Sequence, residues 1–237
     1  MSPPSTTETE AAFAAAAKKR AEAAAKAKKK RPAWQTGCLI ATPFVLIVLA
    51  IVLRIAGFEA FSMEGPSMEP FIANGDRFVI AKYAYGLFLP FSDEASTTWA
   101  SPSPGDVVVV KSPADDIDIV KRVIAVSGQT VEIRNGVVYV DDVALSADEG
   151  QIIEDRGQRT VCRDERLGDI TYATIWDEQS PPGDHPPVAV PEGQAYVLGD
   201  HRDRSNDSRF FGAVPIGRFK GRYALHYVSV EPRLSCP

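Results

Sequence analysis

Residues 130–141 read TVEIRNGVVYVD, and this stretch decides the fold class. Apolar and polar side chains alternate on both sides of Asn135-Gly136, the residue pair that most strongly favours a two-residue hairpin turn. We therefore expect two antiparallel strands here.

Similar short apolar runs lie on both sides of this hairpin, separated by turn residues. We expect strands at residues 77–82, 106–111, 117–126, 195–200 and 220–230. No helical periodicity of comparable length follows residue 57. The fold class is therefore mainly β, an antiparallel β core.

The composition changes between residues 141 and 191, where charged residues, Pro and Gly dominate and residues 180–187 read SPPGDHPP. We interpret this segment as an inserted subdomain or a long loop. The β core is then expected at residues 58–140 and 192–237.

The charge of the chain is divided unevenly. Residues 1–35 hold eight Lys or Arg and three Glu, whereas the remaining chain holds 18 basic and 28 acidic residues, so a net charge of −5 is +5 followed by −10. A nucleic-acid arm and a membrane-surface segment both fit such a tail. Because the tail leads directly into an apolar stretch, we favour the membrane and expect no nucleic-acid partner.

That apolar stretch, residues 36–53, reads TGCLIATPFVLIVLAIVL and contains no charge. Its 18 residues are close to the ~20 that cross a bilayer, and 35 residues precede it, unlike a cleaved secretory signal. We predict a basic, Ala-rich cytoplasmic tail at residues 1–35 and one transmembrane anchor helix at residues 36–57. The positive-inside rule then places the N-terminus in the cytoplasm and the β domain outside the plasma membrane.

Three cysteines are present, and Cys38 lies in the predicted span. Cys162 and Cys236 would face the oxidising side of the membrane. A disulfide between them and two free thiols both fit the sequence, because their separation in space cannot be read from it.

Two segments contain residues that could perform nucleophilic chemistry. Ser67 lies in GPSMEP, where Gly and Pro impose a turn that could present its hydroxyl and backbone N–H in one direction. Lys121 lies in IDIVKRVIAV, where burial would lower its pKa and leave a free amine as base. Taken singly, Ser67 also fits a linker turn and Lys121 a solvated strand position.

A third segment, residues 198–215, reads LGDHRDRSNDSRFFGAVP. Its dense alternating charges around two serines suit a hydrogen-bonded buttress, although a solvated loop has the same composition. The sequence holds only three histidines, and His185 and His226 fit surface or core positions. We therefore do not expect a histidine as the base of a serine nucleophile. We find no phosphate-binding Gly loop and no Cys or His cluster with metal-site spacing, so neither a metal nor a cofactor is expected.

These segments, in this order, resemble the conserved boxes of bacterial type I signal peptidases, which use a serine and a lysine. The matching segments are SMEP (67–70), GDRFVIAKYAYG (75–86), KRVIAVSGQ (121–129) and GDHRDRSNDSRFFG (199–212). The resemblance covers about residues 58–227, apart from the insertion, and it implies a β catalytic core of signal-peptidase type.

The resemblance also implies the roles of individual residues. Ser67 would be the acylated nucleophile and Lys121 its general base, with Ser205 orienting the lysine amine and Asp207 and Arg209 as structural acid and base. Apolar side chains would line the pockets for an Ala-x-Ala cleavage site; they are Phe61, Met63, Met68, Ile72, Ile119 and Val120. The implied reaction is removal of signal peptides from secretory preproteins through an acyl-enzyme.

Several positions depart from the family pattern. Gly65 stands where many members have a serine or threonine that assists the oxyanion, so one oxyanion donor would come from elsewhere. The other departures are Phe71 for threonine, Ala125 for glycine, Gln129 for aspartate and His201 for asparagine. None replaces the nucleophile or the base.

Three other readings compete with a general signal peptidase. A membrane-tethered β module without activity would not need Ser67, Lys121 and Ser205. A self-cleaving Ser/Lys peptidase of the repressor type would not need a membrane span. A specialised pilin or conjugation peptidase with one dedicated substrate fits the same residues.

Overall fold

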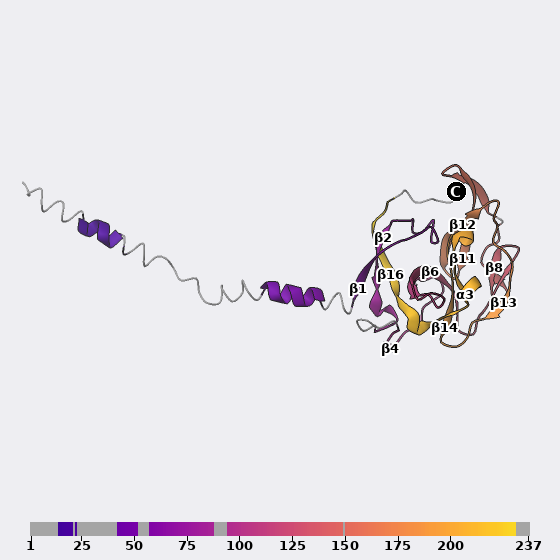
Figure 1. Ribbon diagram of the computed structural model, residues 1–237, viewed down its shortest axis with the longest axis horizontal. Helices are drawn as coiled ribbons and strands as arrows, with labels where there is room; N and C mark the ends of the chain where they lie inside the picture. The colour runs from indigo at the N-terminus through magenta and orange to yellow at the C-terminus, as the bar shows by residue number, and fades with distance from the viewer. Residues whose placement is uncertain are drawn as a thin grey trace, which may run out of the picture. The chain divides into compact units, whose positions relative to one another are not determined.

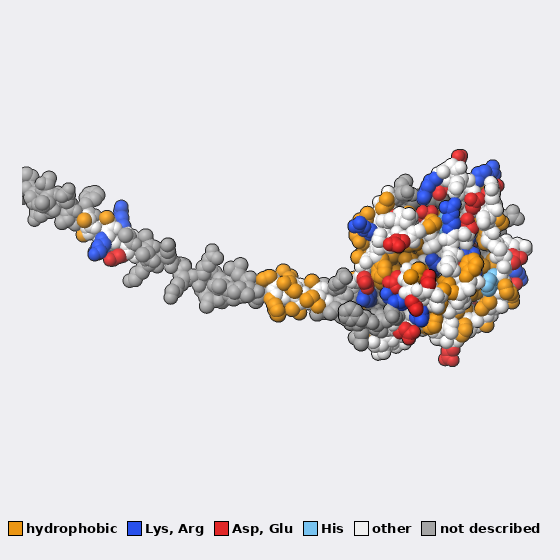
Figure 2. Space-filling view, viewed as in Figure 1, with side chains coloured by type: hydrophobic (Ala, Val, Ile, Leu, Met, Phe, Trp, Pro, Cys, Tyr) orange, Lys and Arg blue, Asp and Glu red, His pale blue; other side chains and the backbone are white. Residues whose placement is uncertain are grey.

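The computed structural model describes residues 14–20, 22, 42–51, 57–87, 94–148 and 150–230. The chain divides into two compact units, Met1–Ala50 and Ile51–Pro237, and each is described by itself. Residues 14–20, 22 and 42–51 are helical, and their side chains are exposed. In Figure 2 the helix at residues 42–51 carries a nearly continuous hydrophobic surface.

The predicted anchor is described only in part, because residues 36–41 and 52–56 lie outside the described residues. None of the helices in the described ranges is long and apolar enough to cross a bilayer. The anchor therefore stays a prediction.

The globular unit is built on a seven-stranded antiparallel sheet with the strand order β1-β2-β16-β5-β6-β14-β15. Figure 1 labels β1, β2, β16, β6 and β14 of this sheet. Its strands are β1 (Phe58–Ser62), β2 (Arg77–Ala81), β16 (Phe219–Val228), β5 (Val107–Lys111), β6 (Asp118–Val126), β14 (Gln194–Leu198) and β15 (Val214–Pro215). Strands β5 and β6 pair as a hairpin in which Val108 faces Lys121 across the ladder. The C-terminal strand β16 is inserted between β2 and β5, so the sheet joins distant parts of the chain.

The predicted hairpin is present. Strands β7 (Thr130–Arg134) and β8 (Val137–Val140) pair around Asn135 and Gly136, which both adopt positive φ, at 50° and 70°. This is the backbone that a type I′ turn requires, and it explains why Asn-Gly occupies it. The two strands belong to a four-stranded sheet with β9 (Val143–Ala144) and β13 (His185–Ala189).

The segment between residues 141 and 191 contains strands that the sequence pattern did not predict. Strands β10 (Gln151–Asp155), β11 (Gln158–Leu167) and β12 (Ile170–Asp177) form a three-stranded antiparallel sheet.

The remaining elements lie outside this segment and are short. Two very short strands, β3 (Gly86–Leu87) and β4 (Thr97–Thr98), form a further pair. The short helical turns are η1 (Lys82–Ala84), η2 (Arg202–Arg204), α3 (Ser208–Phe211) and η3 (Ile216–Arg218).

The apolar core lies in three clusters of buried side chains. One cluster fills the space behind the loop that contains Ser67; it consists of Met63, Met68, Ile72, Phe78, Ile80, Val107, Val109 and Val120. A second joins the hairpin β7–β8 to β6, β14 and the 141–191 segment through side chains such as Ile133, Leu167 and Tyr196. The large sheet and the 141–191 segment thus share a continuous interior, which fixes the loops that carry the candidate site.

Candidate active site

Ser67 lies in the loop between β1 and β2, and its side chain is half-buried. The loop turns at Gly65, whose φ of +84° is the left-handed region that favours glycine. A turn then closes where the backbone N–H of Glu69 donates to the carbonyl of Pro66 at 2.9 Å. The sequence GPSMEP therefore folds as the predicted turn and places the Ser67 hydroxyl at its surface.

Lys121 lies in the middle of β6 and is only 3% exposed. Its Nζ donates to Ser67 Oγ at 2.9 Å and to the carbonyl of Val120 at 2.9 Å. Burial lowers the pKa of Lys121 to about 8, because desolvation of the ammonium outweighs the nearby carboxylates of Asp207 and Asp200. A substantial fraction of this amine is therefore neutral at a mildly alkaline pH.

A cleft of about 460 Å³ opens at Ser67 and Lys121. Four of the six predicted substrate-pocket residues line it: Phe61, Met63, Ile119 and Val120. Its other lining residues are Ser62, Glu64, Val109, Ile117 and Asp118. The structure places Met68 and Ile72 elsewhere, because both side chains are fully buried in the core cluster behind the loop.

The third predicted segment forms a hydrogen-bonded network around Asp207, which is fully buried. Asp207 Oδ2 accepts from Ser205 Oγ at 2.7 Å and from the backbone N–H of Gly199 at 3.0 Å. The guanidinium of Arg209 binds both carboxylate oxygens, each at 2.8 Å. In the described structure Ser205 makes no hydrogen bond to Lys121, so its role in orienting the amine stays a prediction.

Gly199 is the point where this network approaches the nucleophile loop. A Cβ at this position would collide with the side chain of Ser205 and with the carbonyl oxygen of Ser67. Glycine is therefore required for the two loops to pack at this distance. The same contact brings the Asp207 network next to Ser67.

Sequence reasoning assigned no role to Arg122, which follows the candidate base. Its guanidinium forms two hydrogen bonds to Asp200, at 2.8 and 2.7 Å, and donates to the carbonyl of Gly105 at 3.0 Å. Its guanidinium carbon lies over the rings of Phe71 and Tyr172, at 5.2 and 4.2 Å from their centroids. Strand alternation was the sequence signal that could have drawn attention to Arg122. It sends the side chains of neighbouring residues, here Lys121 and Arg122, to opposite faces of the sheet.

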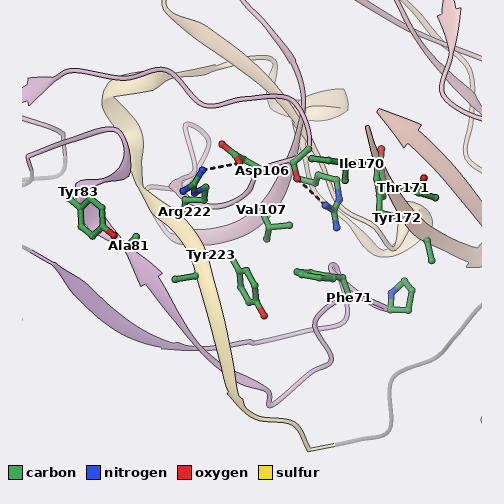
Figure 3. A pocket seen from close by; sticks show the side chains of 15 residues that line it. Phe71, Ala81, Tyr83, Asp106, Val107, Ile170, Thr171, Tyr172, Arg222 and Tyr223 are labelled. Carbon is green, nitrogen blue, oxygen red and sulfur yellow. Dashed lines mark hydrogen bonds and ion pairs between the residues drawn. The ribbon is translucent and has the colours of Figure 1, made fainter. Parts of the chain in front are cut away.

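A second cavity, of about 750 Å³, is lined by Arg122 but not by Ser67 or Lys121. Figure 3 shows Phe71, Tyr172 and Tyr223 around it, with Arg222 directed toward Asp106. The Arg222–Asp106 ion pair spans 3.7 Å. This cavity contains no nucleophile paired with a base, so we locate the candidate chemistry at Ser67.

Two further features bear on ligands and covalent links. Within the described part of the chain, no group of three His, Cys, Asp or Glu side chains could hold a metal ion. Cys162 is disulfide-bonded. The pairing with Cys236 that the sequence left open involves a residue outside the described ranges.

Comparison with known proteins identifies the class to which this fold and site belong. A family model described as "Signal peptidase, peptidase S26" matches residues 37–228. The chain belongs to this family of signal peptidases. Its activity is accordingly of the signal peptidase I type, removal of signal peptides by a serine peptidase.

Individual relatives are named as signal peptidase I enzymes. The chain is 34% identical to a probable signal peptidase I-1 of Synechocystis over 72% of this chain and 71% of that protein. It is 32% identical to a signal peptidase I of Rickettsia typhi, covering 78% of each chain, and 31% identical to that of Pseudomonas aeruginosa, covering 81% and 72%. A crystal structure of a signal peptidase I from Enterococcus faecalis is 26% identical, covers 53% of this chain and 98% of its own, and gives a TM-score of 0.35.

Proposed function

We propose that this signal peptidase cleaves secretory preproteins after Ala-x-Ala sites, with Ser67 as nucleophile and Lys121 as general base. The observation that carries the proposal is the 2.9 Å contact between Lys121 Nζ and Ser67 Oγ, made by a buried lysine with a lowered pKa. Hydrogen-bonding distance between a nucleophile and its base is the geometric requirement for this chemistry.

The reaction proceeds by acyl transfer. Ser67 Oγ attacks the scissile carbonyl carbon while the neutral amine of Lys121 takes the hydroxyl proton. The tetrahedral intermediate then collapses, and Lys121 gives that proton to the leaving amine. A water molecule next loses a proton to Lys121 and attacks the carbonyl carbon of the acyl-enzyme. The second tetrahedral intermediate collapses, Lys121 returns the proton to Ser67 Oγ, and the signal peptide leaves with a free C-terminal carboxylate.

The oxyanion of each tetrahedral intermediate needs hydrogen-bond donors. Among the described residues the backbone N–H of Ser67 has no partner, which leaves it available for this role. The N–H of Gly65 donates to Asn74 Oδ1 at 2.9 Å and is therefore already engaged. We assign one donor to Ser67; in a comparable enzyme the loss of one such donor lowers the rate ~10²–10³-fold.

The substrate's small side chains would enter the apolar part of the cleft, formed by Phe61, Met63, Ile119 and Val120. Met68 and Ile72 support these residues from the core. Ser205, Asp207 and Arg209 would keep the loop after β14 in place against the nucleophile loop, as their mutual hydrogen bonds suggest.

We further propose the domain organisation that the sequence predicts. Residues 1–35 would be a cytoplasmic tail and residues 36–57 a membrane anchor, so that the catalytic core acts on the exoplasmic side of the plasma membrane. Residues 141–191 would be a subdomain inserted into the core formed by residues 58–140 and 192–237.

The test is cleavage of a preprotein by the full chain in detergent. We expect Ser67→Ala and Lys121→Ala each to abolish cleavage after Ala-x-Ala while thermal melting remains cooperative. Cleavage by the wild type should rise with pH through about 8, because only the neutral form of Lys121 accepts the proton. Undiminished turnover in either variant would contradict the Ser/Lys mechanism.

A further inference from the structure

The loop that carries Ser67 also contains a buried carboxylate, two residues after the nucleophile. Glu69 is 6% exposed and lies in an otherwise apolar stretch, MEPFI. Burial by itself would raise the pKa of Glu69, but contacts with His201 and Arg156 outweigh it, so the pKa lies below its ordinary value. A buried ionised carboxylate is costly unless it is paired, so its partners decide its purpose.

His201 is the buried partner of Glu69, and it contacts the nucleophile loop twice. Its Nδ1 lies 3.6 Å from Glu69 Oε2, and its backbone N–H donates to the carbonyl of Ser67 at 3.2 Å. One residue of the loop after β14 thus holds Ser67 through the main chain and Glu69 through the side chain. A shift of the peptide segment between these two contacts would lengthen at least one of them.

Two charged side chains, Asp203 and Arg156, flank this pair. His201 Nε2 lies 3.2 Å from Asp203 Oδ1, and Arg156 Nη2 lies 3.3 Å from Glu69 Oε1. Arg156 comes from the turn between β10 and β11, and its side chain is 57% exposed. Exposed pairs of this kind contribute little. The buried contact between Glu69 and His201, an ion pair when the imidazole is protonated and not a hydrogen bond, is therefore the restraint to test.

We propose that Glu69 and His201 are positioning residues, which hold Ser67 Oγ within hydrogen-bonding distance of Lys121 Nζ. The inference rests on the proposed function of Ser67 and Lys121 and adds the parts that fix their geometry. Neither side chain lines the cleft at Ser67, so neither is expected to touch the substrate. Loss of either contact frees the loop, and displacements of ~1 Å at a reacting atom lower a rate by up to ~10²-fold.

The experiment measures kcat and KM of the full chain in detergent with a signal-peptide-derived fluorogenic peptide. Glu69→Ala and His201→Ala should each lower kcat about 10- to 100-fold and change KM less than about threefold. The double variant should lose no more than the larger single loss, because both side chains form one contact. The acid limb of the pH profile should stay at the wild-type position, since burial and the nearby charges of Asp207, Asp200 and Arg209, which set the pKa of Lys121, are not changed.

His226→Ala is the matched control, because His226 Nε2 forms a similarly buried contact, 2.9 Å, with Asp76 and does not touch Ser67. It should lower the melting temperature and leave kcat within about twofold of wild type. Glu69→Gln and His201→Gln keep the size of each side chain and should lose about fivefold in kcat. They provide the test if the alanine variants do not fold.

Wild-type kcat in folded Glu69 or His201 variants would overturn the inference, as would losses that simply add in the double variant. A rise in KM at unchanged kcat would also overturn it, because it would assign the pair to substrate binding. These outcomes leave the proposed function intact as long as Ser67→Ala is inactive. Cleavage by Ser67→Ala at the wild-type rate would instead reject the proposed function itself.

Discussion

At the scale of single residues, Lys121 is where stability and the proposed chemistry conflict. Its amine is buried and has a pKa of about 8, against an ordinary value of 10.5. The folded state therefore binds fewer protons than the unfolded state between these two values. Folding gains stability as the pH rises from about 8 to 10.5, and below pH 8 the buried amine carries its full penalty.

We expect Lys121→Met to stabilise the protein at pH 7 while abolishing cleavage. A lowering from 10.5 to about 8 corresponds to a penalty on the order of 3 kcal/mol. Loss of the two hydrogen bonds of Nζ offsets part of this gain. Thermal melts should place the variant a few degrees above the wild type at pH 7, with a difference that shrinks toward pH 10.5. A variant less stable than wild type at pH 7 would mean that the buried ammonium of Lys121 is well paired and carries no such penalty.

The candidate site was only partly predictable from the sequence. Ser67 and Lys121 were chosen because ordered motifs made them a pair, and the structure places their side chains 2.9 Å apart. The pocket residues were less predictable, since an apolar side chain can line the cleft, like the half-buried Ile119, or be fully buried in the core, like Ile72. Long-range partners such as Arg122 and Asp200, 78 residues apart, leave no local signal.

At the scale of secondary structure, strands with plain alternation were predictable, whereas β11, with its buried charges, was not. The hairpin β7–β8 follows from its alternation and its Asn-Gly turn. Strand β11 instead reads QRTVCRDERL, with Arg163 3% and Glu165 1% exposed. Glu165 faces inward because Arg202 binds both its carboxylate oxygens, the shorter contact being 2.5 Å. Hydrophobic periodicity in the sequence cannot reveal a strand whose inward side chains are charged.

The contact between Arg122 on β6 and Asp200 in the loop after β14 can be tested by substitution. Asp200 is 1% exposed, and its carboxylate neutralises the buried guanidinium of Arg122. We expect Asp200→Ala to destabilise the protein by about 3–5 kcal/mol, because Arg122 is left buried without its partner. Unfolding of the full chain in detergent with guanidinium chloride measures this loss of stability. Replacing both residues by leucine should cost less than the single substitution, and a loss below about 1 kcal/mol for Asp200→Ala would show that Arg122 finds another partner.

At the scale of the whole molecule, charge and hydrophobicity are separated along the chain. The first 35 residues are basic and the chain beyond them is acidic. Between these parts, the helix at residues 42–51 exposes Phe44, Val45, Leu46, Ile47, Val48, Leu49 and Ile51 (Figure 2). Contiguous exposed apolar surface of this kind marks a site of contact with a partner or a membrane. We propose a bilayer as this partner, because the uncharged run has 18 residues and lysines precede it.

The anchor is tested by charging this helix. We expect the wild type to stay in the membrane pellet through high-salt and carbonate washes. Leu46→Arg with Leu49→Arg should move the protein to the supernatant, because each arginine costs about 2.5–3.5 kcal/mol at the centre of a spanning helix. Leu46→Ile with Leu49→Ile is the matched control and should remain in the pellet. The charged variant should still cleave a short soluble peptide, since Ser67 and Lys121 lie outside the changed helix, but it should process preproteins at the membrane poorly. Release of the wild type by carbonate would reject the anchor while leaving the Ser67–Lys121 proposal untouched.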